Sequence, residues 1–317
     1  MNHETEQQRR MTAMFKRGLG PDICLLLADP EVTDIILTSE GRLWVGRLGQ
    51  KYKEFGVMAA LQAESLMGHV ATSLNRVINA KNPLLDCELP FDGSRFSAAL
   101  PPVVKAPMFC IRKRAIKVFT LNNYVEQGSM TEEQKKAIEV AVYDKENILI
   151  VGGTGTGKTT LANAVLNQIV DVFPDDRIII LEDTQELQCT AKHKEFMRSS
   201  DEISMTTLLK KTLRINPDRI VVSEVRDGAA LDLLDAWNTG HPGGVATLHA
   251  NSARSIFTRL ERLVSLASQA PMQRLIVEAV NLIVYIEKYA DGRRIKEIYR
   301  VIGHDGKDYI TESIGGL

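Results

Sequence analysis

Short, continuous apolar runs, separated by helical stretches, dominate the second half of the chain. The runs are NILIV (147–151), RIIIL (177–181), RIVVS (219–223) and VATLH (245–249). A run of this kind is typical of a strand buried on both faces, and strands that alternate with helices favour a parallel sheet covered on both sides. The pattern therefore predicts an α/β domain with a mainly parallel sheet over residues 131–317.

The first part of the chain has shorter elements that mix strands and helices. The predicted elements are strands at 32–39, 42–49 and 108–116, a helix at 67–78, and turns at Glu40-Gly41 and Asp92-Gly93. The strand signals are apolar runs between turn residues, whereas the helix signal is apolar spacing at the period of a helix. This pattern predicts a smaller α+β domain over residues 21–120, preceded by a polar helix over residues 1–20.

A linker between the two domains is predicted at residues 121–130, which begin with the sequence LNNYVEQGS. Directly after it, Thr131 and Gln134 match a capping box, which predicts the start of a helix that runs to about Val142. A hairpin is predicted over residues 281–302, with its turn at Asp291-Gly292.

Composition excludes several classes of protein. Hydrophobic residues make up 44% of the chain and charged residues 25%, as in soluble globular proteins, and the net charge of −1 gives no overall attraction to nucleic acid or anionic lipid. The four cysteines are far apart, which argues against a zinc ribbon or a disulfide framework. No apolar run approaches the roughly 18 residues of a transmembrane helix, so none is expected.

The sequence GGTGTGKTT directly follows the first apolar run and matches the phosphate-binding pattern G-x-x-x-x-G-K-[ST]. Its glycines allow backbone N–H groups to surround phosphate oxygens, and the helix expected near Lys158 directs its positive end at the same anion. Lys158 is expected to reach the β- and γ-phosphates of ATP, and the Thr159 hydroxyl to bind Mg²⁺. The residues predicted to bind the nucleotide are Gly152, Gly153, Thr154, Gly155, Thr156, Gly157, Lys158, Thr159 and Thr160.

Carboxylates follow two of the other apolar runs, at the edge of the sheet where the phosphates would lie. Glu182 follows RIIIL, and Glu224 follows RIVVS, with Arg226 just beyond it as a further catalytic candidate. A nucleotide hydrolase needs acidic groups beside the phosphates to orient water and to complete the metal site. We predict that Glu182 orients the attacking water and that Glu224 holds the Mg²⁺ shell beside Thr159, while spacing alone leaves the opposite assignment open.

The segment TGHPGGVATLHA ends in the last apolar run, and His249 lies at the carboxyl end of that run. This is the same edge of the sheet as the carboxylates, so His249 is predicted to hydrogen-bond the γ-phosphate or Glu224. Two alternatives stay open, a purely structural histidine and a metal site that includes His241. The loop before the strand is expected to approach its neighbours closely and to move because of its glycines, Gly240, Gly243 and Gly244.

The order of these motifs resembles the secretion-ATPase superfamily, which drives type II and type IV secretion and type IV pili. Its Walker A loop, Asp box, Walker B strand and His box are similar to GGTGTGKTT, ILEDTQEL, RIVVSEVRD and TGHPGGVATLHAN. The resemblance covers most of the chain and is strongest to the TrbB-type conjugative transfer ATPases of type IV secretion systems. Ser223 departs from the pattern, because the family usually has glycine before the Walker B glutamate.

The resemblance implies a RecA-like P-loop ATPase domain and a homo-oligomer, a hexameric ring at the cytoplasmic face of a bacterial inner membrane. It implies hydrolysis of Mg²⁺-ATP to power type IV secretion, conjugative DNA transfer and pilus assembly, with other type IV secretion components as partners. Peripheral membrane contact is compatible with it, and no sequence-specific binding of nucleic acid is expected. The alternatives are a type IV pilus or type II secretion motor, a RecA-like nucleic-acid motor and a non-enzymatic scaffold gated by nucleotide.

Arginines of the first domain are candidates to complete the site. Arg95 follows a predicted turn, and Arg112 and Arg114 alternate on a predicted strand, so their side chains share a face. ATP carries more negative charge than Lys158 and Mg²⁺ neutralise, and a guanidinium pairs with two phosphate oxygens at once. The resemblance implies that Arg95 and Arg112 contact the γ-phosphate; the alternative is solvated charges at strand edges.

Overall fold

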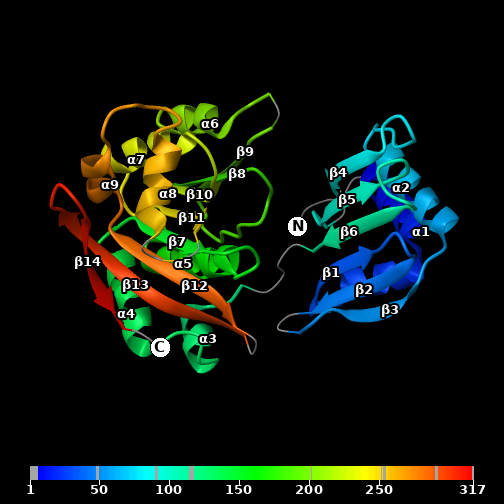
Figure 1. Cartoon of the computed structure of the whole chain (residues 1–317), viewed down its shortest axis with the longest axis horizontal. Coiled ribbons are helices and arrows are strands. Elements are labelled where there is room, and N and C mark those ends of the chain that lie inside the picture. The colour runs from blue at the N-terminus through cyan, green and yellow to red at the C-terminus, as the bar shows by residue number, and fades with distance from the viewer. Residues whose placement is uncertain are drawn as a thin grey trace. The chain divides into compact units, whose positions relative to one another are not determined.

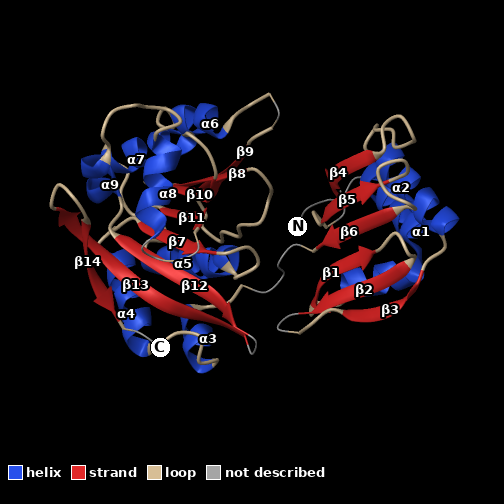
Figure 2. Cartoon of the chain, in the orientation of Figure 1, coloured by secondary structure: helices blue, strands red, loops and turns tan. Residues whose placement is uncertain are grey.

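The computed structural model describes residues 6–47, 50–89, 92–113, 118–200, 202–250, 252, 255–289 and 292–315, with only the backbone of residues 6–12, 14 and 15. The chain folds into two compact units, Met1–Lys117 and Val118–Leu317 (Figure 1). Each unit contains its own β-sheet together with helices (Figure 2). In the described residues, no helix combines the length and the apolar character needed to cross a membrane.

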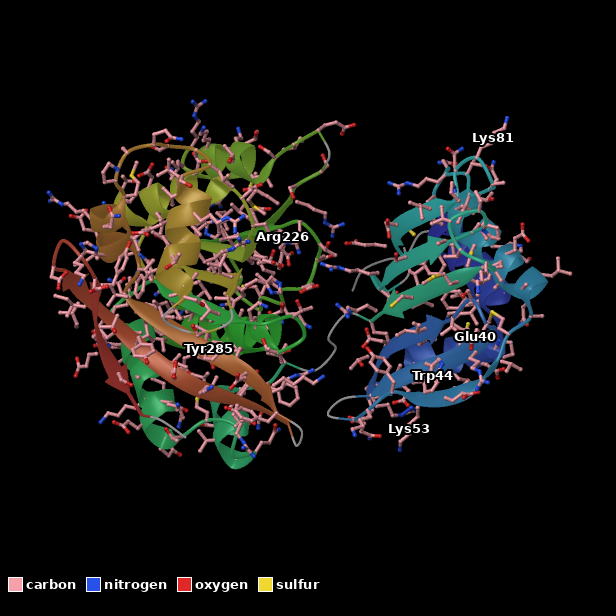
Figure 3. All side chains as sticks on the ribbon, viewed as in Figure 1. Glu40, Trp44, Lys53, Lys81, Arg226 and Tyr285 are labelled. Atoms are coloured by element: carbon pink, nitrogen blue, oxygen red, sulfur yellow. The ribbon has the colours of Figure 1, made fainter. Side chains whose placement is uncertain are left out.

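The first unit is built around an antiparallel sheet. Its elements are α1 (Glu6–Ala28), β1 (Val32–Leu37), β2 (Arg42–Arg47), β3 (Lys53–Val57), α2 (Ala60–Ser73), β4 (Leu84–Glu88), β5 (Arg95–Ala99) and β6 (Met108–Arg112). The strands lie in the order β3-β2-β1-β6-β5-β4, and neighbouring strands run antiparallel. Figure 3 labels Trp44 on β2 and Glu40 in the turn between β1 and β2.

Helices α1 and α2 pack together against one face of this sheet. Leu66 and Met67 of α2 are buried in a single core with Ile35 of β1 and with apolar side chains of α1. α1 bends at Gly20, whose φ of 79° is not helical, and Pro21 follows directly. Arg95 and Arg112 alternate with the core residues Phe96 and Ile111, so they lie on the face that the helices leave uncovered.

The second unit is built around a larger, mainly parallel sheet. Its helices are α3 (Leu121–Glu126), α4 (Glu132–Tyr143), α5 (Lys158–Val172), α6 (Met205–Thr212), α7 (Ala229–Asn238), α8 (Ser255–Val264) and α9 (Gln273–Ala279). Its strands are β7 (Ile148–Gly152), β8 (Ile178–Glu182), β9 (Lys194–Arg198), β10 (Arg219–Val225), β11 (Val245–His249), β12 (Leu282–Tyr289), β13 (Gly292–His304) and β14 (Tyr309–Ile314).

The strands of the second unit lie in the order β14-β13-β12-β7-β11-β10-β8-β9. The pairings from β12 to β9 are parallel, whereas β13 and β14 extend the sheet antiparallel. Helices α3, α4 and α5 bury apolar side chains on one face, and α6, α7, α8 and α9 do so on the other. All residues of β7 and β8 are buried, and they are apolar up to the last residue of each strand, Gly152 and Glu182.

The strands predicted from the apolar runs are confirmed, since β7, β8, β10 and β11 coincide with them. The capping box is also confirmed: the Thr131 side chain accepts the Gln134 N–H, and the Gln134 side chain accepts the Thr131 N–H, at the start of α4. The predicted hairpin near the end of the sequence is formed by β12 and β13. Asp291, in its predicted turn, lies outside the described residues.

Other local predictions differ from the structure. Part of the predicted linker forms α3, because a second capping box, made by Thr120 and Asn123, starts a helix there. α2 overlaps the helix predicted at 67–78, but it begins earlier, at Ala60, and ends earlier, at Ser73. Asn75, two residues after the end of α2, has a non-helical φ of 54°. The predicted N-terminal helix ends at the kink at Gly20, and a second helical segment of α1 follows it as far as Ala28. The predicted turn at Asp92-Gly93, in contrast, does lie between two paired strands, β4 and β5.

Candidate active site

The predicted phosphate-binding sequence forms the connection between β7 and α5. β7 ends at Gly152 and α5 begins at Lys158, so the loop lies between a buried strand and a helix N-terminus. Gly157 has a φ of 97°, a backbone conformation that residues other than glycine rarely adopt. A Cβ on Gly152 would lie 2.3 Å from the carbonyl oxygen of Ile286. The sequence therefore has the strand, loop and helix that a phosphate-binding loop requires.

The threonines of this segment have different surroundings. Thr156 is buried, and its hydroxyl donates to the Gly153 carbonyl oxygen at 3.0 Å. Thr154 is exposed on the loop, and Thr160 is half-buried in the first turn of α5. The loop is thus held by its own side chains on one side and left open at Thr154 and Gly155.

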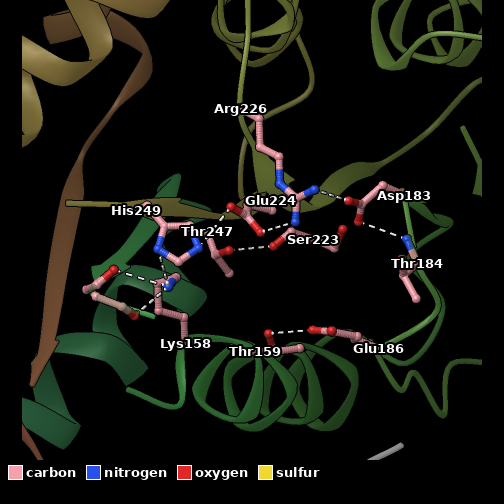
Figure 4. Close-up of polar contacts among 12 residues, drawn as sticks. Lys158, Thr159, Asp183, Thr184, Glu186, Ser223, Glu224, Arg226, Thr247 and His249 are labelled. Atoms are coloured by element: carbon pink, nitrogen blue, oxygen red, sulfur yellow. Dashed lines mark hydrogen bonds and ion pairs between the residues drawn. The ribbon is translucent and has the colours of Figure 1, made fainter. Parts of the chain in front are cut away.

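Lys158 is buried inside the loop that it follows. Its Nζ donates to the carbonyl oxygens of Gly152 (3.1 Å) and Gly153 (2.9 Å) and lies 3.2 Å from Nδ1 of His249 (Figure 4). Burial lowers the pKa of Lys158. Nearby carboxylates act in the opposite direction, and the largest of these opposing effects comes from Glu224. Because an ammonium group can only donate, Nδ1 of His249 is the acceptor in this contact.

A chain of polar contacts continues from His249 across the carboxyl ends of neighbouring strands. Nε2 of His249, on β11, lies 3.0 Å from Oε1 of Glu224, on β10. Arg226 Nη2 donates to Oε2 of Glu224 at 2.7 Å, and Arg226 Nη1 lies 2.6 Å from Oδ2 of Asp183, just after β8. Figure 4 shows these side chains meeting at one edge of the sheet.

These contacts determine the charge of the site. Burial by itself would raise the pKa of Glu224, but the Arg226 hydrogen bond and the surrounding positive charges outweigh it and lower the pKa. Burial and the charge of Lys158 lower the pKa of His249, against the effect of Glu224. At neutral pH, Glu224 is therefore a carboxylate and His249 a neutral imidazole whose Nε2–H faces that carboxylate.

Thr159 and Glu186 form a second polar contact beside the loop. The Thr159 hydroxyl, in the first turn of α5, donates to Oε2 of Glu186 at 2.9 Å. Glu182 is only 2% exposed, and its Oε1 accepts the backbone N–H groups of Glu186 (2.8 Å) and Leu187 (2.7 Å). Glu182 thus holds the backbone of the segment after β8, and Glu186 is the carboxylate of that segment that reaches the phosphate loop.

A known family shares most of this chain, including every element of the site. The family model described as type II/IV secretion system protein matches residues 18–290. The chain belongs to this family. Within the type II/IV secretion family, it is similar to proteins of conjugal transfer, as the order of the motifs predicted.

Two curated relatives show how close that similarity is. The chain is 48% identical over 303 residues to the conjugal transfer protein TrbB of Rhizobium radiobacter, covering 96% of this chain and 94% of the relative. It is 49% identical over 304 residues to the probable conjugal transfer protein TrbB of Sinorhizobium fredii, with the same 96% and 94% coverage. These identities confirm the predicted resemblance to the TrbB group.

A solved structure supports the fold of this secretion-family chain. The X-ray structure of the ATPase DotB of Yersinia pseudotuberculosis has a TM-score of 0.65 to it, with 16% sequence identity, and the match covers 98% of this chain and 79% of that one. At this identity the similarity bears on the fold alone.

Several residues predicted for the site come together and others do not. Lys158, His249, Glu224 and Arg226 form one continuous set of contacts. Oε1 of Glu182, in contrast, accepts backbone N–H groups of the segment after β8. No role is predicted for Glu186 or Asp183 from the sequence, because the path of the loop after β8 cannot be inferred from residue spacing.

The predicted arginines of the first unit lie side by side. Arg95 on β5 and Arg112 on β6 are register partners, so their side chains share a face of the sheet. Arg112 Nε donates to Oδ1 of Asp34 at 2.9 Å, which partly offsets the repulsion between the two guanidinium groups. Arg114 lies outside the described residues.

Two further residues of the motifs have structural contacts. His241 Nδ1 lies 3.0 Å from the carbonyl oxygen of Pro217, at the base of the glycine-rich loop. Ser223, which replaces the glycine usual in the family, is buried, and its carbonyl oxygen accepts the Thr247 hydroxyl at 2.5 Å. Ser223 therefore joins β10 to β11 directly before Glu224.

Proposed function

We propose that this chain is a Mg²⁺-dependent ATPase that works as a hexameric ring and powers type IV secretion, conjugative DNA transfer and pilus assembly. The observation that carries the proposal is the set of contacts from Lys158 through His249 and Glu224 to Arg226. It connects the group that would bind phosphate to groups that can orient water. Phosphoryl transfer depends on such positioning and on electrostatic stabilisation.

In the proposed reaction, Lys158 exchanges the loop carbonyls for the β- and γ-phosphate oxygens of ATP. Its charge there offsets the negative charge of the transition state. The backbone N–H groups of the loop and the N-terminus of α5 bind the remaining phosphate oxygens. Once Lys158 has moved, Nδ1 of His249 is released, and His249 can signal the presence of nucleotide to Glu224.

Mg²⁺ suits the oxygen donors beside the loop. This ion usually binds one or two protein oxygens together with waters and substrate phosphates, rather than a cage of protein ligands. The Thr159 hydroxyl and the Glu186 carboxylate, 2.9 Å apart, are donors of that kind. In the described part of the chain, no group of three or more His, Cys, Asp and Glu residues could hold a metal ion by itself. We assign Thr159 as the direct ligand and Glu224 to the water shell of the ion, which neutralises phosphate charge when bound.

Glu186 is a better candidate than Glu182 to orient the attacking water. Oε1 of Glu182 already accepts two backbone N–H groups, and the residue is only 2% exposed, so its carboxylate has little access to an attacking water. Glu186 already contacts Thr159, the residue assigned to the metal. We therefore reassign the predicted role of Glu182 to Glu186, and Glu182 becomes a positioning residue.

The assembly and the cellular role are proposed from the relatives. Because the similarity to the conjugal transfer proteins spans almost the whole chain, we propose the same process for this protein, with other type IV secretion components as partners. The hexameric ring and a peripheral position at the cytoplasmic face of the inner membrane belong to the same proposal. The parallel sheet with helices on both faces supports a RecA-like ATPase core.

The ATPase proposal is tested by Lys158→Ala. Turnover of ATP is expected to fall about 10²–10³-fold, because the charge at the transferring phosphate is lost. Lys210→Ala is the control, since Lys210 is a largely exposed lysine of α6 that pairs with Asp232. Phosphate release and the unfolding midpoint are measured for both variants. Near-parental turnover in Lys158→Ala, with the fold intact, would remove the basis of the proposal.

A further inference from the structure

The hairpin of β12 and β13 reaches the phosphate loop from the opposite end of the sequence. β12 pairs in parallel with β7, with Val284 beside Ile150 and Tyr285 beside Val151. β7 ends at Gly152 and turns into the loop, whereas β12 continues to Tyr289 and turns back into β13. The end of the hairpin therefore extends past the strand that carries the loop.

Arg293, at the start of β13, contacts the loop at two places. Its Nε donates to the carbonyl oxygen of Gly155 at 3.2 Å. A Cβ added to Gly157 would lie only 3.1 Å from Cδ of Arg293, so a larger residue at position 157 would displace the arginine. The side chain thus contacts the loop with its stem at Gly157 and with its guanidinium at Gly155.

Arg293 also has a neighbour on the first helix of the second unit. Tyr124 of α3 is buried, and burial raises the pKa of its hydroxyl, while the positive charge of Arg293 acts in the opposite direction. Arg293 is therefore near enough to Tyr124 for its positive charge to affect the pKa of the tyrosine hydroxyl.

The contact with Gly155 has a consequence for the peptide bond that follows. In a trans peptide, the C=O of one residue and the N–H of the next point in opposite directions. A guanidinium that holds the Gly155 carbonyl therefore keeps the N–H of Thr156 pointing away from Arg293. A hydrogen bond from a charged donor to the carbonyl also polarises this N–H. Backbone N–H groups with a fixed direction are what a loop of this type offers to phosphate.

We propose that Arg293 is a positioning residue of the nucleotide site, which orients the Gly155–Thr156 peptide so that its N–H binds a phosphate of the di- or triphosphate chain. This inference rests on the proposed ATPase function for the identity of the ligand. It makes the β12–β13 hairpin a part of the phosphate-binding site, although the hairpin lies outside every motif identified in the sequence.

Binding of ADP and of inorganic tripolyphosphate, measured by calorimetry, tests the proposal. Arg293→Met keeps an unbranched stem on Gly157 and removes the guanidinium, so the affinity for both ligands is expected to fall about tenfold. Arg293→Lys keeps the charge without the planar fork and is expected to bind with intermediate affinity. In ATP turnover, Arg293→Met is expected to raise KM about tenfold and to change kcat less, because the loop peptide acts on binding.

The matched control is Arg294→Met. Arg294 follows Arg293 directly, but successive strand residues point to opposite faces, and its guanidinium lies 5.3 Å from the ring of Tyr289. This variant changes the net charge of the hairpin equally and is expected to bind ADP within about twofold of the parent. Equal losses in the two variants, or parental affinity in Arg293→Met with an unchanged unfolding midpoint, overturn the proposal. A parent that binds ADP but does not hydrolyse ATP contradicts the proposed function instead, and leaves this inference standing.

Discussion

The carboxylates of Glu182 and Glu186 bind different partners, although the two residues are only four positions apart. The Glu182 carboxylate is buried and accepts two backbone N–H groups, whereas the Glu186 carboxylate accepts the Thr159 hydroxyl. The same segment therefore contains one carboxylate that shapes the loop and one that faces the nucleotide-binding residues. The first role requires only an acceptor oxygen, whereas the second requires the charge and access to substrate.

This difference leads to a prediction for the two glutamine variants. Glu186→Gln removes the proposed general base and is expected to lower kcat about 10²-fold or more, with little change in ADP affinity. In Glu182→Gln, the amide oxygen can still accept both N–H groups, so kcat is expected to stay within about tenfold of the parent. Single-turnover ATP hydrolysis and ADP binding are measured for both. If Glu182→Gln is the slower enzyme, the reassignment is wrong and the original prediction stands.

The cysteines allow a prediction about pH. Burial raises the pKa of Cys87 to about 11, because the thiolate is disfavoured away from water. At pH 8, roughly a thousandth of this thiol is ionised, far less than for an ordinary cysteine with a pKa of about 8.5. Alkylation of Cys87 by iodoacetamide should be much slower in the folded protein than in urea, and should speed up about tenfold per pH unit below pH 11. Mass spectrometry of the labelled peptide measures both; equal rates in the folded and unfolded protein would contradict the prediction.

At the scale of elements, α4 depends on contacts with residues far away in sequence. Gln134 is fully buried, accepts the Thr131 N–H as part of the capping box, and donates from Nε2 to the carbonyl oxygens of Ile295 (3.2 Å) and Gly315 (3.0 Å). One side chain therefore starts the helix and also joins it to β13 and to the residue after β14. The local motif and the tertiary contacts reinforce each other.

The two residues of this capping box are expected to differ in their contribution to stability. Thr131→Ala removes one acceptor at the helix start and should lower the free energy of unfolding by about 1 kcal/mol. Gln134→Ala also leaves two carbonyl oxygens without a donor, so its effect should be larger, about 2–3 kcal/mol. Urea unfolding of both variants measures the difference. A loss in Gln134→Ala no greater than that in Thr131→Ala would show that the contacts with Ile295 and Gly315 contribute nothing.

The glycine-rich loop before β11 is shaped by the packing of neighbouring elements. Arg219 is fully buried, its Nε donates to Asp176 Oδ2 at 2.6 Å, and its Nη1 donates to the carbonyl oxygen of Gly243 at 2.9 Å. A Cβ on Gly244 would lie 2.1 Å from Trp237 Nε1. Close approach, as predicted, is therefore one reason for these glycines. The contacts also hold the base of the loop firmly beneath the strand that carries His249.

At the scale of the whole molecule, the proposed motor joins two units with different sheets. The nucleotide loop and its strand-end residues belong to Val118–Leu317, whereas Arg95 and Arg112 belong to Met1–Lys117. We propose that these arginines contact the γ-phosphate and thereby let the first unit respond to ATP. Their placement as cross-strand partners supports a shared role, because two like charges opposite each other are otherwise unfavourable.

This role predicts that Arg95→Gln and Arg112→Gln each lower ATP turnover about tenfold or more, since an arginine that stabilises transferring phosphate is worth at least that much. Arg47→Gln is the control, because Arg47 lies in the same sheet and pairs with Asp29 at 3.0 Å, much as Arg112 pairs with Asp34. Steady-state phosphate release compares the three variants. If the Arg95 and Arg112 variants turn over ATP like Arg47→Gln, both arginines are structural charges of the first unit.

The sequence by itself determined the features that depend on neighbouring residues and on burial. Its apolar runs located β7, β8, β10 and β11, and its phosphate-binding pattern located the loop before Lys158. Both signals are local, because a strand buried on two faces must be apolar throughout and a tight anion-binding loop needs glycine at set positions. The positions of Glu224 and His249 near strand ends follow from the same apolar runs.

The tertiary structure alone decided which side chains meet at the site. Glu186 rather than Glu182 contacts Thr159, because the backbone after β8 turns around the buried Glu182 carboxylate. Arg293 contacts Gly155 from 138 residues away, because β12 lies next to β7 in the sheet. Contacts of this kind depend on the order of the strands and on the path of loops. Neither is encoded in the spacing of residues along one segment, so the sequence located the site and the packing of distant segments assigned its members.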